Sequence, residues 1–350
     1  MHRPVTLPYI LASAAIYALD SLLRLVKSRI TFAYIRPLPE LDITRVEIPS
    51  INCGWRAGQH IRLRVLTLQM GRLAWTETHP FTIASASHSQ EGMVLLCKCA
   101  GDWTQKLFDM AKLSSEAGNM GIPIRVVVEG PYGGPGHTIY SSFSAAVLIA
   151  GGSGITYAIS VVQDIIQKDL KGESRLKSID LVWIVRNPAN LSPLLPLLSS
   201  LVQESVYTPL RICVFYTRAP TGKQPPFFAR TLILNNTFPS RYQYPPYSPQ
   251  PPLRLGRKQS IRTPRDLDLP LGITLAPGRP KFSRIFEEAI ADAVALGPGA
   301  KCDESVNGVV VGVCGPVNLI DDVSKAVNAI DPVRRDQVGG VEICEEVFGW

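Results

Sequence analysis

Glycines between an apolar run and a helical stretch form the first pattern in this chain that could do chemistry. Leu148-Ile149-Ala150 leads into Gly151-Gly152-Ser153-Gly154, and a helix-like stretch follows from Tyr157 to Lys168. Glycines let backbone N–H groups approach a pyrophosphate, and a helix N-terminus supplies partial positive charge for it. The turn therefore predicts a nucleotide site. Because the spacing is not G-x-G-x-x-G, an ordinary tight turn of an α/β domain stays open as the alternative.

A second pattern puts a histidine and hydroxyl residues into one strand-like segment, His79-Pro80-Phe81-Thr82-Ile83-Ala84-Ser85. Gly101-Asp102-Trp103-Thr104 follows at the start of a helical run, and Glu129-Gly130-Pro131-Tyr132-Gly133 ends an apolar stretch. These segments are candidates for a second site. Two alternatives stay open: His79 as a structural core residue, and Trp103 as a packing residue.

The elements that must position these residues change character near Ser144. Upstream, short strands separated by turn residues predict a small antiparallel barrel or sandwich; they lie within Ile43–Leu68 and at Phe81–Ala84, Val94–Cys99 and Arg125–Val128. Downstream, apolar runs alternate with helical stretches, which predicts a parallel α/β sheet; the runs are Ala145–Ala150, Ile179–Val185, Leu210–Tyr216 and Gly308–Val313. A length of 350 residues also fits two domains. We place them at residues 30–140 and 141–350.

The N-terminal segment from Leu7 to Val26 is mostly apolar over about the length that crosses a bilayer. Asp20 and Arg24 interrupt it, and basic residues follow it. It lacks the cleavage pattern of a signal peptide. A last transmembrane helix with a basic cytosolic flank and an amphipathic helix on a surface both fit this composition. We assign residues 1–29 as a terminal membrane helix.

Positive charge is concentrated between Ala219 and Lys281, where ten Lys and Arg residues stand against Asp266 and Asp268. This stretch carries +8 and the whole chain +7, so the remainder is near neutral, and no nucleic acid is expected as a partner. Thirteen of the 29 prolines lie in the same stretch, so residues 219–270 are interpreted as a proline-rich surface insertion. Seven cysteines without a CxxC pair and five scattered histidines predict no metal site.

Eight motifs occur in an order that carries a family resemblance: HPFTIAS, GDWT, EGPYG, AGGSGIT, WIVRN, GRP, VCGP and a terminal aromatic residue. Together they make the chain similar to the dehydrogenase half of the fungal ferric-chelate reductases. These are relatives of the NADPH oxidases within the ferredoxin–NADP reductase superfamily. The resemblance covers about Pro8 to Trp350 without the insertion. It implies an antiparallel flavin-binding β-barrel followed by a Rossmann-like parallel α/β domain that binds NADPH.

The resemblance implies that the first domain binds FAD. Thr82 would lie near the isoalloxazine and His79 nearer the ribityl chain or the phosphates, with Ser85 on the same strand face. Thr104 and the helix start would offer a hydroxyl and free N–H groups to the pyrophosphate. The expected FAD contacts are His79, Pro80, Phe81, Thr82, Ser85, Gly101, Thr104 and Gly130.

The resemblance assigns the second domain to NADPH, with the pyrophosphate on Gly151, Gly152, Gly154 and Thr156. Arg186 ends the strand LVWIVR where a Rossmann-type sheet presents the adenosine ribose, and an Arg there fits a 2′-phosphate. Arg279 is the second candidate for that phosphate. A solvated surface charge is the alternative for both.

The resemblance also places Cys314, with Gly315 and Pro316, beside the nicotinamide. Trp350 would cover the flavin until the nicotinamide displaces it. A frayed terminus is the alternative for Trp350. Cys314 and Trp350 are therefore the residues expected to take part in catalysis.

The function implied is an NADPH-dependent, FAD-containing ferric-chelate reductase, in which electrons continue through haem to a ferric or cupric chelate. His2 is the only histidine near the apolar helix. Haem is therefore expected only in an upstream membrane part or in a haem-bearing membrane subunit, and the chain is expected to be truncated. We expect it at the plasma membrane with both domains on the cytosolic side. The alternatives are a superoxide-producing enzyme like the NADPH oxidases, and a haem-less regulatory fragment of a membrane reductase.

Overall fold

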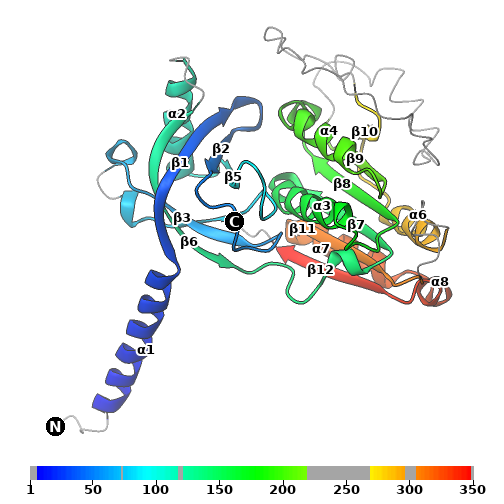
Figure 1. Cartoon of the computed structure of the whole chain (residues 1–350), viewed down its shortest axis with the longest axis horizontal. Coiled ribbons are helices and arrows are strands. Elements are labelled where there is room, and N and C mark those ends of the chain that lie inside the picture. Colours follow the sequence, from blue (N-terminus) through cyan, green and yellow to red (C-terminus); the bar gives the residue numbers. More distant parts are fainter. Residues whose placement is uncertain (1–5, 72–73, 117–120, 219–268, 296–304, 348–350) are drawn as a thin grey trace.

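The computed structural model describes residues 6–71, 74–116, 121–218, 269–295 and 305–347. Two folded domains lie side by side, and one helix extends away from the first of them (Figure 1). Most of the proline-rich stretch, residues 219–268, and the last three residues lie outside this description.

The N-terminal helix α1 spans Thr6–Val26 and has no buried residue. Its length and composition suffice to cross a membrane. Only Lys27 separates it from the first strand, β1 (Ser28–Leu38). The polypeptide therefore passes directly from the apolar helix into the sheet of the first domain, as Figure 1 shows.

The first domain is a six-stranded antiparallel sheet that curves into a near-barrel, with the strand order β4-β3-β6-β1-β2-β5. The remaining strands are β2 (Ile43–Ile48), β3 (His60–Val65), β4 (His79–Thr82), β5 (Met93–Lys98) and β6 (Ile122–Tyr132). Side chains alternate between core and solvent along β3, where Ile61, Leu63 and Val65 are fully buried. Helix α2 (Asp102–Glu116) packs beside β1 and β2. Short 3₁₀ turns lie at Pro39–Leu41 (η1), Leu68–Met70 (η2) and Ala74–Thr76 (η3).

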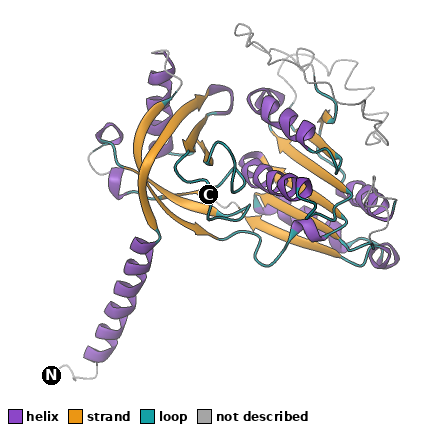
Figure 2. Cartoon of the chain, in the orientation of Figure 1, coloured by secondary structure: helices purple, strands orange, loops and turns teal. Residues whose placement is uncertain are grey.

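The second domain is a six-stranded parallel sheet with the order β10-β9-β8-β7-β11-β12. Its strands are β7 (Ala145–Gly151), β8 (Ser178–Val185), β9 (Leu210–Tyr216), β10 (Ile273–Pro277), β11 (Val309–Gly315) and β12 (Val341–Val347). Helices cover both faces of the sheet (Figure 2). They are α3 (Ile155–Leu170), α4 (Leu195–Glu204), α6 (Phe282–Val294), α7 (Val317–Asn328) and α8 (Pro332–Gln337), with 3₁₀ segments at Tyr140–Ser142 (η4), Gly152–Gly154 (η5) and Pro188–Leu194 (η6).

The central strands explain why this sheet forms. Six consecutive residues of β7, Ala145 to Ala150, are fully buried, as expected for a strand covered by helices on both faces. One apolar cluster lies under α3 and α4, and a second lies under α6 and α7. The first cluster continues across the domain boundary to Ala57, Ala84 and Leu96, so the two domains share buried apolar surface.

The predicted fold class is confirmed: an antiparallel near-barrel precedes a parallel α/β domain, and an apolar helix lies at the N-terminus. The apolar runs that predicted the parallel sheet coincide with β7, β8, β9 and β11. Strands β1, β10 and β12 are additions that the sequence patterns did not reveal. The proline-rich insertion predicted at 219–270 falls almost entirely outside the described residues.

Candidate cofactor-binding site

Two of the predicted motifs of the first domain meet through Trp103. The ring centroid of Trp103, at the start of α2, lies 4.4 Å from that of His79 and 6.0 Å from that of Phe81, both on β4. Trp103 is 5% exposed, so it is a packing residue, as expected. The side chain of His79 is 35% exposed, so His79 is not a buried core histidine. The HPFT strand and the GDWT helix start therefore form one structural unit.

The opposite face of the same strands aligns three other polar groups. Thr82 pairs with His60 of β3, and His60 pairs with Tyr132 of β6. Because paired residues share a face and neighbours alternate, these three side chains form a row across the sheet. Burial, and then the charge of Arg62, lower the pKa of His60. Sequence patterns missed His60, since only the strand pairing brings it between the two motifs.

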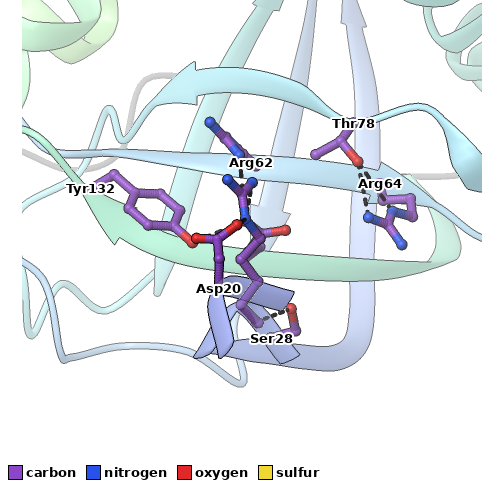
Figure 3. A network of polar contacts seen from close by, with 8 residues as sticks. Asp20, Ser28, Arg62, Arg64, Thr78 and Tyr132 are labelled. Carbon is purple, nitrogen blue, oxygen red and sulfur yellow. Dashed lines mark hydrogen bonds and ion pairs between the residues drawn. The ribbon is translucent and has the colours of Figure 1, made fainter. Parts of the chain in front are cut away.

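A buried carboxylate organises the end of β6. Glu129 has a side chain only 8% exposed and accepts a hydrogen bond of 2.9 Å from the Tyr132 hydroxyl. The guanidinium groups of Arg24 and Arg62 lie 3.8 and 3.7 Å from the same Glu129 oxygen, and Lys27 lies over the Tyr132 ring. Tyr132, Arg62 and Asp20 gather at this junction of α1 with the sheet (Figure 3). The EGPYG motif, with Gly130, is thus surrounded by cationic groups.

Two predicted FAD contacts have hydroxyl groups that are already engaged by the chain itself. Ser85 lies beyond the end of β4 and is buried; its hydroxyl donates to Gly92 O and accepts from Val94 N–H. The Thr104 hydroxyl accepts from the N–H groups of Ala100 and Gly101 and donates to Gly101 O. Both side chains hold loop backbone in place. Both hydroxyl groups therefore stabilise loops of the first domain, and their contacts with FAD stay predictions.

The glycine turn at Gly151–Gly154, predicted to bind a phosphate and called the phosphate turn below, is closely packed on one side and open on the other. A Cβ at Gly151 would meet Leu319 and Pro316, and one at Gly154 would overlap the carbonyl of Cys314. Gly152 has φ +54° and no atom within 4 Å of its Cβ position, so its backbone is accessible to a ligand. The Trp183 indole N–H donates to Gly152 O at 2.9 Å and fixes the turn. The Thr156 hydroxyl donates to Ser153 O.

Three arginines, not two, follow neighbouring strands at the carboxyl edge of the sheet. Arg186 follows β8 and is exposed, and Arg279 follows β10 with a side chain 79% exposed and 3.9 Å from Asp322. Between them, Arg218 follows β9, and its backbone N–H donates to Arg186 O at 3.0 Å. Ligands of open α/β sheets bind at this edge. Arg218 carried no motif and became apparent only from the strand order.

The last strand brings an unexpected carboxyl group beside Cys314. Cys314 is 1% exposed, and burial raises the pKa of its thiol, so it is a neutral group at neutral pH. Glu346 of β12 is paired with Cys314, and Val347 with Gly315. Partial burial also raises the pKa of Glu346. Trp350, the predicted catalytic aromatic, lies outside the described residues.

The residues present fit a flavin and a nicotinamide nucleotide. The open backbone at Gly152 and the helix start behind it suit a pyrophosphate. In the first domain, the indole N–H of Trp103 is buried without a hydrogen-bond partner among the described residues, beside the first turn of α2. A buried donor at a helix start, flanked by His79, suits an anionic ligand.

The fold, an antiparallel near-barrel followed by a parallel α/β sheet, is similar to that of a solved structure. The likeness extends to the ferredoxin reductase of carbazole 1,9a-dioxygenase, at a TM-score of 0.50 and 13% identity over 92% of this chain and 70% of that chain. At this identity the match concerns the fold alone.

The family follows from the sequence comparisons. The model described as "Ferric reductase NAD binding domain" matches residues 143–328, and the model "FAD-binding domain" matches residues 33–136. The chain belongs to the ferric reductase NAD-binding family, and the predicted resemblance to the ferric reductases and NADPH oxidases is confirmed.

Two curated relatives illustrate the range of the family. Ferric reduction oxidase 8, mitochondrial, of Arabidopsis thaliana is 30% identical over 60% of this chain and 28% of its own length. Dual oxidase 2 of Homo sapiens is 30% identical over 51% of this chain and 11% of its own length. The chain thus matches less than a third of the length of either relative.

Proposed function

We propose that this chain is the electron-input unit of an NADPH-dependent ferric-chelate reductase. The observation that carries the proposal is the position of the phosphate turn, whose Gly151 and Gly154 pack directly against Pro316 and Cys314 at one sheet edge. This packing supports a site in which the pyrophosphate of a nucleotide and its nicotinamide would lie close together. The matches of both domains to ferric reductase and FAD-binding families support it.

The cofactors supply the redox chemistry. When bound, FAD would take the hydride, two electrons and one proton, that oxidises NADPH to NADP⁺, and would pass the electrons on singly to an acceptor. The chain's own residues would bind the two cofactors, orient them toward each other and exclude water from them. We propose that Gly151, Gly152 and the start of α3 hold the NADPH pyrophosphate, and that Arg186, Arg218 and Arg279 hold the 2′-phosphate.

In the first domain, we propose that the polar row of Thr82, His60 and Tyr132 and the start of α2 hold FAD. The neutral, buried Cys314 offers packing and a weak S–H donor beside the nicotinamide; it has no role as a base. Glu346, with its raised pKa, is the candidate for holding a proton at that edge. We retain Trp350 as the proposed cover of the flavin.

The position at a membrane is also part of the proposal. Helix α1 is exposed along its whole length and joins β1 through one residue, which suits an anchor that holds the flavin domain at the cytosolic surface. Carbonate washing of membranes that contain the full chain tests this: an integral helix stays in the pellet. Release into the supernatant would show that α1 is a peripheral helix and does not span the membrane.

The final acceptor separates the two candidate functions. Dual oxidase 2 matches this chain at the same 30% identity as ferric reduction oxidase 8, which keeps oxygen open as the acceptor. We propose a ferric or cupric chelate, reached through a haem-bearing membrane subunit. In sealed vesicles with NADPH inside, co-expression with such a subunit should give reduction of external ferric chelate. Superoxide formation without chelate reduction would instead favour the oxidase.

A further inference from the structure

One face of α3 is bonded to the flavin-binding domain. Tyr157, Ser160 and Gln163 follow one another at three-residue spacing, which places them on one side of the helix. All three contact loops of the first domain, although α3 itself belongs to the nucleotide domain. The helix begins at the phosphate turn, since η5 (Gly152–Gly154) runs directly into it.

Two hydrogen bonds join backbone of one domain to side chains of the other. The Gly58 N–H donates to Ser160 Oγ at 3.1 Å in a buried position, and the Ser160 hydroxyl donates to Tyr157 O at 2.8 Å. The Ala86 N–H donates to Gln163 Oε1 at 2.9 Å. Backbone donors move little, so they fix the position of the helix more closely than two flexible side chains could.

The ring of Tyr157 packs against Gly58 of the first domain. A Cβ at Gly58 would lie 2.6 Å from the Tyr157 ring and 3.2 Å from Pro135, so only glycine fits there. The hydroxyl groups of Tyr157 and Tyr140 share a hydrogen bond of 2.7 Å. The Tyr157 ring is therefore held from both ends.

Apolar surface surrounds these contacts and keeps water away from them. Leu41, Ala57, Ala84 and Leu96 of the first domain belong to the same buried cluster as Tyr157 and its neighbours on α3. A hydrogen bond in such surroundings is costly to leave unmade, because the freed donor cannot turn to water. The buried hydrogen bonds therefore favour one relative position of the two domains.

These contacts connect the two proposed cofactor segments through a single helix. Ala86 follows the HPFTIAS segment, and α3 starts at the GGSG turn. We propose that Ser160 and Gln163 are positioning residues: with Tyr157 they form an interdomain clamp that sets the distance between the nicotinamide and the flavin. The clamp rests on the proposed function, because it presupposes hydride transfer between the two domains.

The test uses the full chain, loaded with FAD, and variants that change one acceptor at a time. Gln163→Met keeps the length of the side chain and removes the acceptor for the Ala86 N–H, whereas Gln163→Glu keeps an acceptor. Gln167→Met is the matched control one turn further along α3, because Gln167 has no hydrogen bond to the first domain among the described residues. Ser160→Ala, alone and combined with Gln163→Met, removes the second contact.

Flavin reduction by NADPH is followed by rapid mixing, together with the isotope effect of deuterated NADPH. We expect Gln163→Met to slow reduction by on the order of tenfold, and the double variant by up to about a hundredfold, because a misplacement of about 1 Å can cost that much. FAD content and the KM for NADPH should stay unchanged. Gln163→Glu should recover most of the rate, and Gln167→Met should match the wild type.

Hydrogen exchange separates failure of the clamp from failure of the proposed function. The amides of Gly58 and Ala86 should be protected in the wild type, and the variants should lose the protection of their own partner amide, whether or not NADPH reduces the flavin. Wild-type reduction rates in the double variant, or a slower rate that only follows loss of FAD, would overturn the clamp. Free exchange of both amides in the wild type would overturn it as well. If both amides are protected but NADPH does not reduce the flavin, the interdomain contacts are present and the proposed function is wrong.

Discussion

Gly154 faces the carbonyl group of Cys314 with no room for a side chain between them. The contact joins the turn after β7 to the end of β11, two strands that are hydrogen-bonded neighbours. Gly151 and Gly315 repeat the arrangement one step along, where a Cβ on Gly315 would lie 3.3 Å from Gly151. The phosphate turn and the CGP motif are thus one packed unit.

Substitution of Gly154 should therefore be costly. Gly154→Ala should lower the free energy of unfolding by about 1–3 kcal/mol, because the added methyl must displace backbone. Gly101→Ala is the control, since a Cβ at Gly101 would meet no atom within 4 Å. Chemical denaturation of both variants measures the difference. Equal stability of the two variants would show that the turn is not packed as described.

The arginines at the sheet edge should select NADPH over NADH. Arg186→Ala, Arg218→Ala and Arg279→Ala should each weaken NADPH by one to two decades, because a charge-assisted phosphate contact is worth about 1.5–3 kcal/mol. Binding of NADH, which has no 2′-phosphate, should hardly change. Arg334→Ala, an exposed arginine on α8, is the control. Equal losses for both nucleotides would argue against a 2′-phosphate site.

Substitutions can distinguish the proposed FAD contacts, Thr82 and His79, from Ser85, whose hydroxyl bonds to loop backbone. The double substitution Thr82→Ala with His79→Ala should give folded protein that purifies without yellow colour. Ser85→Ala should keep FAD but lose about 1–3 kcal/mol of stability, because it leaves Val94 N–H without its acceptor. Flavin content and thermal unfolding distinguish these outcomes. A double variant that keeps stoichiometric FAD would show that this strand does not bind the flavin.

Local patterns predicted the elements, and pairing between distant segments decided which residues meet. The buried run Ala145–Ala150 and the glycine turn could be recognised in the sequence, because hydrophobic periodicity and composition are local properties. His60, Arg218 and Glu346 were missed, since each becomes relevant only through its strand partner: Thr82, Arg186 and Cys314. The intrachain hydrogen bonds of Ser85 and Thr104 were also missed, because each hydroxyl is engaged by loop backbone three to nine residues away.

The pKa of Glu346 gives a pH dependence with a defined sign. Burial raises this pKa above the ordinary value of 4.5, so the folded state binds the proton more tightly than the unfolded chain. Its contribution to stability is present below about pH 4.5 and is lost as the pH rises through the folded pKa. Glu346→Gln should therefore be more stable than the wild type at neutral pH, relative to their difference at pH 4.5. Melting temperatures at several pH values test this; a gap that does not grow with pH contradicts it.

Anaerobic titration of the full-length, FAD-loaded chain with NADPH tests the central claim most directly. The two proposed cofactor segments lie on domains that share a buried interface, and we expect electrons to pass between them within this one chain. We predict that one equivalent of NADPH bleaches the flavin absorbance completely, and that NADH at the same concentration does so far more slowly. A flavin that stays oxidised in the presence of excess bound NADPH would contradict the account.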